Sequence, residues 1–295
     1  MPELPEVENA RRLIAEHALG RRISDVDDSD SYVLRPHPPG ELKSALTGRR
    51  LTAAHRRGKT MWVETSGTSD GPAADADAAG PEVGLHLGMS GRIVVTGPDG
   101  TVIEAGDPYR YGGRGRNPVW SRFTLTFADG GSLVLLDPRR LGRVWLNPGI
   151  SALGPDATEV TFGEFRALIT KGTIAVKARL LDQSKIAGVG NLLADEILWQ
   201  ARVAPLISVS QLTPAQVKRL YEALTAVVAA AIAHGGAHTG EIIAQRRPGG
   251  TCPRDGAPMA HGVVGGRSTW WCSREQALRP ARRRRAAGPP KTGSQ

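Results

Sequence analysis

Apolar residues recur at every third or fourth position near the start of the chain and again in its second half. Over residues 5–19 this spacing predicts a helix. The same spacing returns after about residue 150 and predicts helices over three further segments: 161–170, 192–201 and 213–234. The last helix has the clearest start, because Thr213 and Gln216 form a capping box around Pro214 at the first helical position.

Short runs of alternating apolar and polar residues fill the part of the chain between these helices. Bounded by Gly, Pro, Asp and Ser, they predict six strands: 51–54, 60–64, 84–86, 92–95, 123–127 and 132–136. Many short strands at such spacing favour a sandwich or barrel. The sequence therefore predicts an α+β protein with an N-terminal β-sandwich flanked by helices, followed by a helical C-terminal domain that ends in a small β-hairpin.

Changes in composition suggest the domain boundaries. We expect a sandwich domain over residues 1–150, with a mobile acidic insertion at about 66–82, and a helical domain over residues 151–248. A Gly-, Cys- and Trp-rich hairpin follows at 249–278, and a disordered basic tail at 279–295.

Composition excludes several classes of protein. Thirty-six glycines, 21 prolines and only 5% aromatic residues indicate a turn-rich globular protein. The apolar runs are too short for a membrane span, and the acidic N-terminus does not resemble a secretion signal. Two cysteines cannot form a disulfide framework, which favours a reduced, cytoplasmic setting.

Most of the positive charge lies in the tail. The formal net charge is +9, and residues 279–295 carry six basic and no acidic residues, which leaves +3 for residues 1–278. A polybasic tail attracts any polyanion without selecting one. Charge alone therefore permits nucleic-acid binding but does not identify it.

The N-terminus carries the first candidate for covalent chemistry. Removal of Met1 would leave Pro2 with a free secondary amine, a useful fraction of which is neutral at pH 7. Such an amine attacks aldehyde-level carbons to form an iminium, and Glu3 beside it could transfer protons. The alternative for these residues alone is an ordinary helix entry.

Two further motifs could bind phosphate. Lys59 follows Gly58 at a predicted turn between strands, although a solvated surface lysine is the alternative there. The sequence Gly188-Val189-Gly190-Asn191 enters a predicted helix, whose N-terminus offers free N–H groups to an anion, with Asn191 as a possible side-chain donor. The alternative is a glycine-rich loop with an asparagine cap.

The C-terminal hairpin has the spacing of a zinc finger but only half of the usual ligands. Cys252, Asp255, Cys272 and Glu275 stand at the four ligand positions, whereas structural zinc favours Cys and His. We expect no cofactor. Zinc is the alternative, and a hairpin in which arginines pair with the two carboxylates accounts better for the residues present. Arg267 is expected at the hairpin tip, where a guanidinium suits phosphate recognition.

Together these motifs resemble the formamidopyrimidine-DNA glycosylase/endonuclease VIII family, over residues 1–276. The Leu-Pro-Glu-Val start resembles that of the formamidopyrimidine-DNA glycosylase branch more than that of the endonuclease VIII branch. The motifs occur in this order: Pro2-Glu3-Leu4-Pro5-Glu6-Val7-Glu8, Arg57-Gly58-Lys59, His86-Leu87-Gly88-Met89-Ser90-Gly91, Asp137-Pro138-Arg139-Arg140, Asp182-Gln183, Gly188-Val189-Gly190-Asn191, Ala194-Asp195-Glu196-Ile197-Leu198 and Gly265-Gly266-Arg267-Ser268-Thr269.

The resemblance implies a bifunctional DNA glycosylase and abasic-site lyase with a helix-two-turn-helix domain. Pro2 would attack C1′ of the damaged nucleotide, Glu3 would protonate the opened sugar, and Lys59 would assist β-elimination. Arg267 would assist δ-elimination and, with Asn191, hold phosphates. The residues implied to contact DNA are Glu6, His86, Met89, Arg139, Arg140, Leu141, Lys177 and Asn191. Of these, Met89, Arg139 and Leu141 would fill the space that the extruded base leaves.

Departures from the family pattern leave the damaged base unidentified. Asp255 and Glu275 replace zinc cysteines, Leu141 replaces a phenylalanine wedge, and Leu193 replaces a tyrosine. The segment 235–252 is also shorter than the region that holds the lesion-capping loop in 8-oxoguanine-specific relatives.

The resemblance implies that the partner is damaged double-stranded DNA. It also implies that the enzyme is a monomer, associates with the nucleoid and does not bind a membrane. The alternative function is a non-catalytic protein that binds lesions or abasic sites on the same scaffold.

Overall fold

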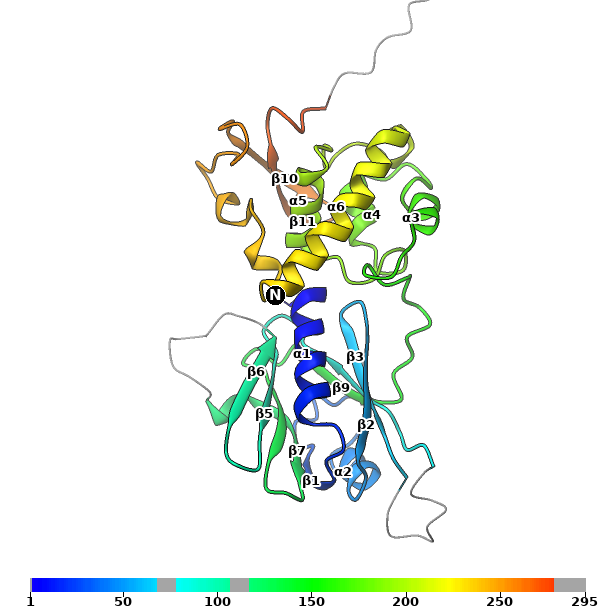
Figure 1. Ribbon diagram of the computed structural model, residues 1–295, viewed down its shortest axis with the longest axis vertical. Coiled ribbons are helices and arrows are strands. Elements are labelled where there is room, and N and C mark those ends of the chain that lie inside the picture. Colours follow the sequence, from blue (N-terminus) through cyan, green and yellow to red (C-terminus); the bar gives the residue numbers. More distant parts are fainter. Residues whose placement is uncertain (1, 68–77, 107–116, 279–295) are drawn as a thin grey trace, which may run out of the picture.

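The computed structural model describes residues 2–67, 78–106 and 117–278. It has two lobes, an N-terminal one built of strands and a C-terminal one built of helices, with α1 (Leu4–His17) reaching the junction between them (Figure 1). The α+β prediction is confirmed. Among the described residues, no helix is long and apolar enough to cross a membrane.

The N-terminal lobe contains two antiparallel sheets. The first has the order β1-β7-β8-β5-β6, with bounds β1 (Ile23–Asp27), β7 (Ser121–Phe127), β8 (Ser132–Leu136), β5 (Arg92–Thr96) and β6 (Val102–Gly106). The second has the order β2-β3-β4-β9, with bounds β2 (Leu51–Arg57), β3 (Thr60–Thr65), β4 (Val83–His86) and β9 (Arg143–Leu146). A short helix, α2 (Glu41–Leu46), lies against β1.

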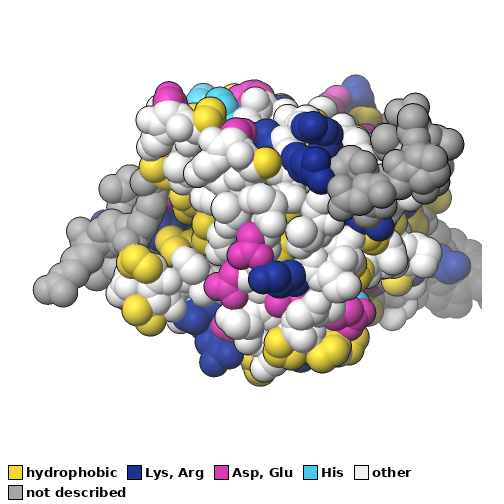
Figure 2. Space-filling model, turned by 90° about the horizontal axis from the view of Figure 1, so that it is seen from below, with side chains coloured by type: hydrophobic (Ala, Val, Ile, Leu, Met, Phe, Trp, Pro, Cys, Tyr) yellow, Lys and Arg dark blue, Asp and Glu magenta, His cyan; other side chains and the backbone are white. Residues whose placement is uncertain are grey.

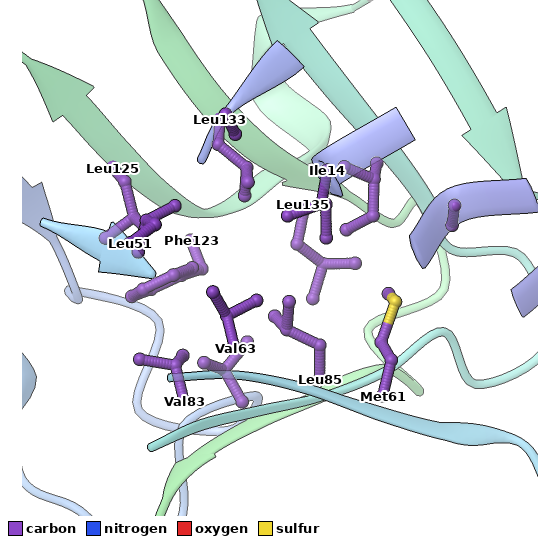
Figure 3. Packing of buried hydrophobic residues seen from close by; sticks show 14 of the residues in the cluster. Ile14, Leu51, Met61, Val63, Val83, Leu85, Phe123, Leu125, Leu133 and Leu135 are labelled. Carbon is purple, nitrogen blue, oxygen red and sulfur yellow. The ribbon is translucent and has the colours of Figure 1, made fainter. Parts of the chain in front are cut away.

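The two sheets face each other across one apolar core. Alternate residues of each strand point inward, as in β7, where Phe123, Leu125 and Phe127 are all buried. Figure 3 shows Leu125 and Leu133 of one sheet facing Val63 and Met61 of the other. Burying each such side chain contributes about 1.5–3 kcal/mol relative to leaving it exposed.

The C-terminal lobe is organised around two longer helices, α5 (Asn191–Gln200) and α6 (Pro214–Ala233). Thr213 and Gln216 form the expected capping box at the start of α6. Two shorter helices, α3 (Phe162–Ile169) and α4 (Val176–Leu181), complete the second core. The predicted hairpin is present as β10 (Met259–Val264) and β11 (Arg267–Cys272), over a third small core around Trp199.

The six predicted strands are all present, but the prediction omitted β1, β6, β9, α2 and α4. The omitted elements are four to six residues long. Too few residues lie in each for a period to emerge, and β6 lies half-buried at a sheet edge. The predicted tail at 279–295 and most of the predicted insertion at 66–82 lie outside the described residues.

Helix α1 and one buried ion-pair network join the lobes. Val7, Ala10 and Ile14 belong to the sandwich core, whereas Leu4 belongs to the core of the C-terminal lobe. Beside them, Arg56 of β2 donates to Glu8 of α1 (3.0 Å) and to Asp156 of the C-terminal lobe (2.5 Å). These contacts fix the orientation in which the two lobes present their loops to each other.

Candidate functional site

Three segments that are distant in the sequence meet at the lobe junction: the start of the chain, the Gly58-Lys59 turn, and the loop that enters α5. The contacts are so close that only glycine fits. A Cβ at Gly58 would lie 2.8 Å from Ala187 Cβ, one at Gly188 would lie 2.4 Å from Leu4 Cδ1, and one at Gly190 would lie 2.1 Å from Glu3 Cδ. Glycine at these positions therefore permits the close approach of backbones that builds the site.

Glu3 is the centre of this junction. It is completely buried, and its carboxylate accepts hydrogen bonds from the backbone N–H groups of Leu192 (2.8 Å) and Leu193 (3.1 Å) in the first turn of α5. We expected that helix N-terminus to be free for a phosphate. In the structure the protein's own carboxylate takes two of its donors, which corrects that expectation and satisfies the helix end. Pro2, which is also buried, directly precedes Glu3 in the sequence.

Leu193, which stands where the family resemblance predicts a tyrosine, contributes to the site through its backbone N–H. Its side chain is buried in the C-terminal core, and only its backbone N–H reaches Glu3. Because that contact does not depend on the side chain, leucine preserves the support of Glu3.

Glu3 and Lys59 share one electrostatic environment. Burial raises the pKa of Glu3, and Lys59 and the N–H groups of α5 oppose that rise. Burial also lowers the pKa of Lys59, an effect that Glu3 opposes and Arg267 reinforces. The ammonium of half-buried Lys59 donates to the carbonyl of Val189 (3.1 Å). A carboxyl group made easier to protonate therefore lies near an amine made easier to deprotonate, an arrangement suited to proton transfer.

Glu6 supports the site from inside. Its two oxygens accept from the backbone N–H groups of Glu3 (2.9 Å) and Ala237 (2.7 Å), and it is 2% exposed. Burial raises its pKa to about 7. Since its acceptors are already used within the protein, the structure places Glu6 beneath the site, not at the surface where the sequence predicted a DNA contact.

Lys177 is the second predicted DNA contact that the structure places inside the protein. The side chain is 0% exposed, and its ammonium contacts Asp195 Oδ1 (2.6 Å), Thr269 Oγ1 (2.8 Å) and the carbonyl of Ser268 (3.2 Å). It therefore connects α4 to β11 and has no free surface for a phosphate. The sequence gives no signal of this, because its partners lie up to 92 residues away.

Asn191 and His86 lie at the edges of the junction. Asn191 is the first residue of α5, and its buried Oδ1 has no hydrogen-bond partner within the described residues. His86 ends β4 and accepts from the N–H of Gly88 (3.0 Å), while burial first and Lys59 second lower its pKa.

Two apolar side chains project from adjacent loops beside the junction. Met89 is 37% exposed and Leu141 is 39% exposed. A Cβ at Gly88 would lie 2.3 Å from the carbonyl carbon of Leu141, so the two loops touch. Arg139 and Arg140 are exposed on the second loop, and Arg140 pairs with Asp30 (2.7 Å).

Asp137 holds this pair of loops, a role that sequence reasoning missed. Its carboxylate accepts from the N–H groups of Arg139, Leu141 and Gly142 at 3.1, 2.7 and 2.7 Å, and from the hydroxyl of Ser90. The exposed Met89 and Leu141 thus stand on loops that Asp137 ties together. The signal in the sequence was an aspartate at the start of the motif Asp137-Pro138-Arg139-Arg140.

The opposite end of the N-terminal lobe has a different character. Acidic and basic side chains are interspersed among the described residues visible there (Figure 2), and pairs such as Lys43 with Asp25 (2.7 Å) neutralise each other. Such a mixture does not form the single-sign field that a polyanion needs.

In the hairpin, Arg267 is exposed at the start of β11, directly after the Gly265-Gly266 tip, as predicted. Potential ligand atoms of Cys252, Asp255 and Cys272 lie within 4.8 Å of one another, so this group could hold a metal ion. Glu275 is engaged elsewhere, by Arg254 (2.5 Å) and Arg202 (3.4 Å).

The hairpin group offers fewer thiolate or imidazole ligands than a structural zinc usually has. The Cys272 thiol lies 3.5 Å from both oxygens of Asp255, and burial raises its pKa. Structural zinc sites use four ligands, mostly thiolates and imidazoles. Within the described residues only three groups converge here, and one of them is a carboxylate.

Comparison with known proteins identifies relatives of both lobes. A model described as the formamidopyrimidine-DNA glycosylase N-terminal domain matches residues 1–144, and one described as the formamidopyrimidine-DNA glycosylase H2TH domain matches residues 152–242. A formamidopyrimidine-DNA glycosylase of Stenotrophomonas maltophilia is 32% identical over 295 residues, covering 92% of this chain and 98% of the relative. One from Arabidopsis thaliana is 35% identical over 245 residues, which span 79% of this chain and 58% of the relative.

A solved structure agrees with the fold. It is the Lactococcus lactis Fpg in complex with DNA containing an abasic site. The two chains superpose with a TM-score of 0.74 at 26% identity, over 94% of this chain and 100% of the other.

Replacing Glu6 by glutamine should flatten the dependence of stability on pH. Because folding raises the pKa of Glu6 from 4.5 to about 7, its contribution is fully present below pH 4.5 and is lost as the pH rises through 7. The loss amounts to about 3 kcal/mol. The free energy of unfolding of wild type should therefore fall by about that much more than that of Glu6→Gln between pH 4.5 and pH 8.

Urea denaturation across this pH range measures the effect. Glu16→Gln, on the exposed face of the same helix, controls for the substitution itself. A difference between wild type and Glu6→Gln that stays constant with pH would contradict the assigned role of Glu6.

Proposed function

This chain belongs to the formamidopyrimidine-DNA glycosylase family, and from that premise we propose which of its residues perform the reaction. It is a DNA glycosylase of base excision repair with abasic-site lyase activity, and damaged DNA is its partner. We further propose that it acts as a monomer at the nucleoid. The observation that carries the residue assignments is the position of Pro2 and Glu3 at the start of α5, beside Lys59.

We propose that Pro2, freed by removal of Met1, is the nucleophile. Its neutral secondary amine attacks C1′ as the bond from C1′ to the damaged base breaks, and the base leaves with the bonding electrons and a proton. Glu3 donates a proton to the ring oxygen, so that the sugar opens and the nitrogen of Pro2 becomes a cationic iminium. The raised pKa of Glu3 supports this role, because it keeps a proton available on a buried carboxyl group.

Strand cleavage follows from the iminium. Loss of a proton at C2′ and expulsion of the 3′ phosphate constitute β-elimination. We propose that Lys59 exchanges protons in this step, a role that its lowered pKa supports. Arg267, exposed at the hairpin tip, supports the second, δ-elimination. Asn191 at the first residue of α5 assists in holding the phosphates.

Met89, Leu141 and Arg139 are proposed to occupy the space of the extruded nucleotide. The first two are exposed apolar side chains on touching loops, the geometry of an intercalating wedge. A leucine fills volume but offers no ring for stacking on the opposite base, which argues for weak discrimination among opposite bases.

We propose that 8-oxoguanine is disfavoured, which leaves formamidopyrimidines, hydantoins, oxidised pyrimidines and bare abasic sites as substrates. The segment that follows α6 folds into compact turns, η4 (Ala237–Thr239) and η5 (Ile243–Gln245). These are tied down by bonds from Ala237 N to Glu6 (2.7 Å) and from Ile242 N to Glu196 (3.1 Å). Such a segment has little length left to close over a purine.

We propose that the hairpin needs no metal. The thiol of Cys272 lies beside the Asp255 carboxylate, and the Glu275 carboxylate has arginine partners. Cys252 Sγ accepts from Trp199 Nε1 (3.3 Å), so all four positions have partners within the protein.

Borohydride should trap a covalent complex between the protein and abasic DNA, because reduction of the iminium is irreversible. Pro2→Gly or an N-terminal tag should abolish trapping under matched conditions. Pro5→Ala, which removes a proline from the first turn of α1, should retain it. Gel analysis after confirming a Pro2 terminus by mass spectrometry measures the outcome. A wild-type protein that binds abasic DNA but is never trapped would instead indicate the non-catalytic binding function.

A panel of lesion duplexes tests the proposed base preference. We expect abasic sites, hydantoins, formamidopyrimidines and oxidised pyrimidines to be cleaved faster than 8-oxoguanine, each measured against several opposite bases. Leu141→Phe should sharpen opposite-base discrimination, because a ring can stack, and Leu141→Met is the matched control. Fastest cleavage of 8-oxoguanine would refute the assignment.

Purified protein should contain far less than one zinc per chain, and a chelator should not change its unfolding temperature. Elemental analysis and thermal denaturation measure both. Stoichiometric zinc whose removal destabilises the hairpin would overturn the metal-free interpretation.

A further inference from the structure

Asp195 of α5 is the meeting point of two buried or nearly buried cations. It is 1% exposed. Its Oδ1 lies 2.6 Å from the ammonium of Lys177 in an ion pair that is not aligned as a hydrogen bond. Its Oδ2 accepts from Arg246 Nε (2.9 Å) and from the backbone N–H of Trp270 (3.1 Å). We call this group of three charged residues the Asp195 triad.

The triad ties the hairpin strand to the helix that holds Glu3. Trp270 belongs to β11, three residues after Arg267. Lys177 also donates to Thr269 Oγ1 and to the carbonyl of Ser268 in the same strand. Each residue of β11 from Ser268 to Trp270 is therefore bonded to the triad, and α5, which carries Asp195, also binds the Glu3 carboxylate at its first turn.

Close to Arg267, the hairpin tip also packs against α4, where a Cβ at Gly265 would lie 3.1 Å from Ala178 Cβ, but this contact involves no ion pair. The incomplete Cys252, Asp255 and Cys272 group lies at the far end of β11, and so does the Arg254–Glu275 pair. The tip residues Gly265 and Gly266 are exposed. The polar attachments that hold the strand carrying Arg267 are thus those at residues 268–270.

We propose that Asp195 is a positioning residue for strand cleavage. With Lys177 and Arg246, it fixes β11 so that Arg267 stands at a set distance from Pro2 and Glu3. This inference rests on the proposed function, since it concerns what holds Arg267 in position for the δ-elimination step. Removing the negative charge leaves two cations facing each other in a buried space, which loosens β11 without touching the residues that form the iminium.

The test separates the two elimination steps. On preformed abasic DNA, wild type should give mainly the δ product, whereas Asp195→Asn should lower the ratio of δ to β product about tenfold, because small misplacements of a catalytic group have large effects on rate. Borohydride trapping should stay within about threefold of wild type, since Pro2 and Glu3 are not displaced. Glu275→Gln, a carboxylate of the same hairpin with arginine partners at its far end, is the matched control and should keep the wild-type product ratio.

A double substitution shows whether Asp195 acts through Arg267. In an Arg267→Ala background, Asp195→Asn should cause no further change in the product ratio. An additional drop there, or an unchanged ratio in Asp195→Asn alone, would overturn the proposal. If Asp195→Asn does not fold, Lys177→Met combined with Asp195→Asn removes one charge of each sign and answers the same question.

Hydrogen exchange gives a readout that does not require activity. Amides of residues 268–271 should exchange faster in Asp195→Asn than in wild type, and those of α1 should not. Unchanged protection of β11 would refute the anchoring role even if no lesion were cleaved. If borohydride does not trap the wild-type protein on abasic DNA, the proposed function is refuted instead. Failure of the anchoring role can therefore be told apart from failure of the proposed function.

Discussion

The burial of the Glu3 carboxylate against the first turn of α5 is the interaction on which the site depends. A charge taken out of water is costly unless it is compensated, and here the compensation comes from two backbone N–H groups and the positive end of a helix. This contact holds the beginning of the chain against a helix that is nearly 190 residues distant. It also explains the glycines at 188 and 190, since any larger residue would displace Leu4 or Glu3.

The same junction concentrates groups that reduce the stability of the fold. Burial raises the pKa values of Glu3 and Glu6 and lowers that of Lys59, so each carries an unfavourable term in its charged form. Perturbed pKa values of this kind cluster where protons must be transferred near neutral pH. The cost is offset elsewhere, by two large apolar cores and by the Arg56 network between the lobes.

Local sequence patterns predicted what is local. The capping box of α6, the Gly58-Lys59 turn and Arg267 at the hairpin tip all lie where spacing alone placed them. Met89 and Leu141 are both exposed, and the wedge that the family resemblance implied for them stays a prediction. What could not be predicted depends on contacts between distant residues.

Lys177 and Glu6 show the limit clearly. Both are charged residues that the family resemblance implied to contact DNA. Their burial arises from partners such as Asp195, Thr269 and Ala237, which no local period relates to them. The helix N-terminus at Asn191 likewise looked vacant, because its occupant, Glu3, comes from the opposite end of the sequence.

The placement of Pro2 and Glu3 against α5 also orders events during synthesis. The first residues leave the ribosome long before α5 exists, and at about 5–20 residues per second the interval lasts roughly ten to forty seconds. Throughout that interval the contacts between Glu3 and α5 cannot form, so the amino terminus stays accessible for the proposed removal of Met1. Once α5 and its loop are made, the junction closes around the new terminus. Maturation of the proposed nucleophile is thus ordered by translation: the chain exposes its amino terminus early and encloses it only after α5 has been made.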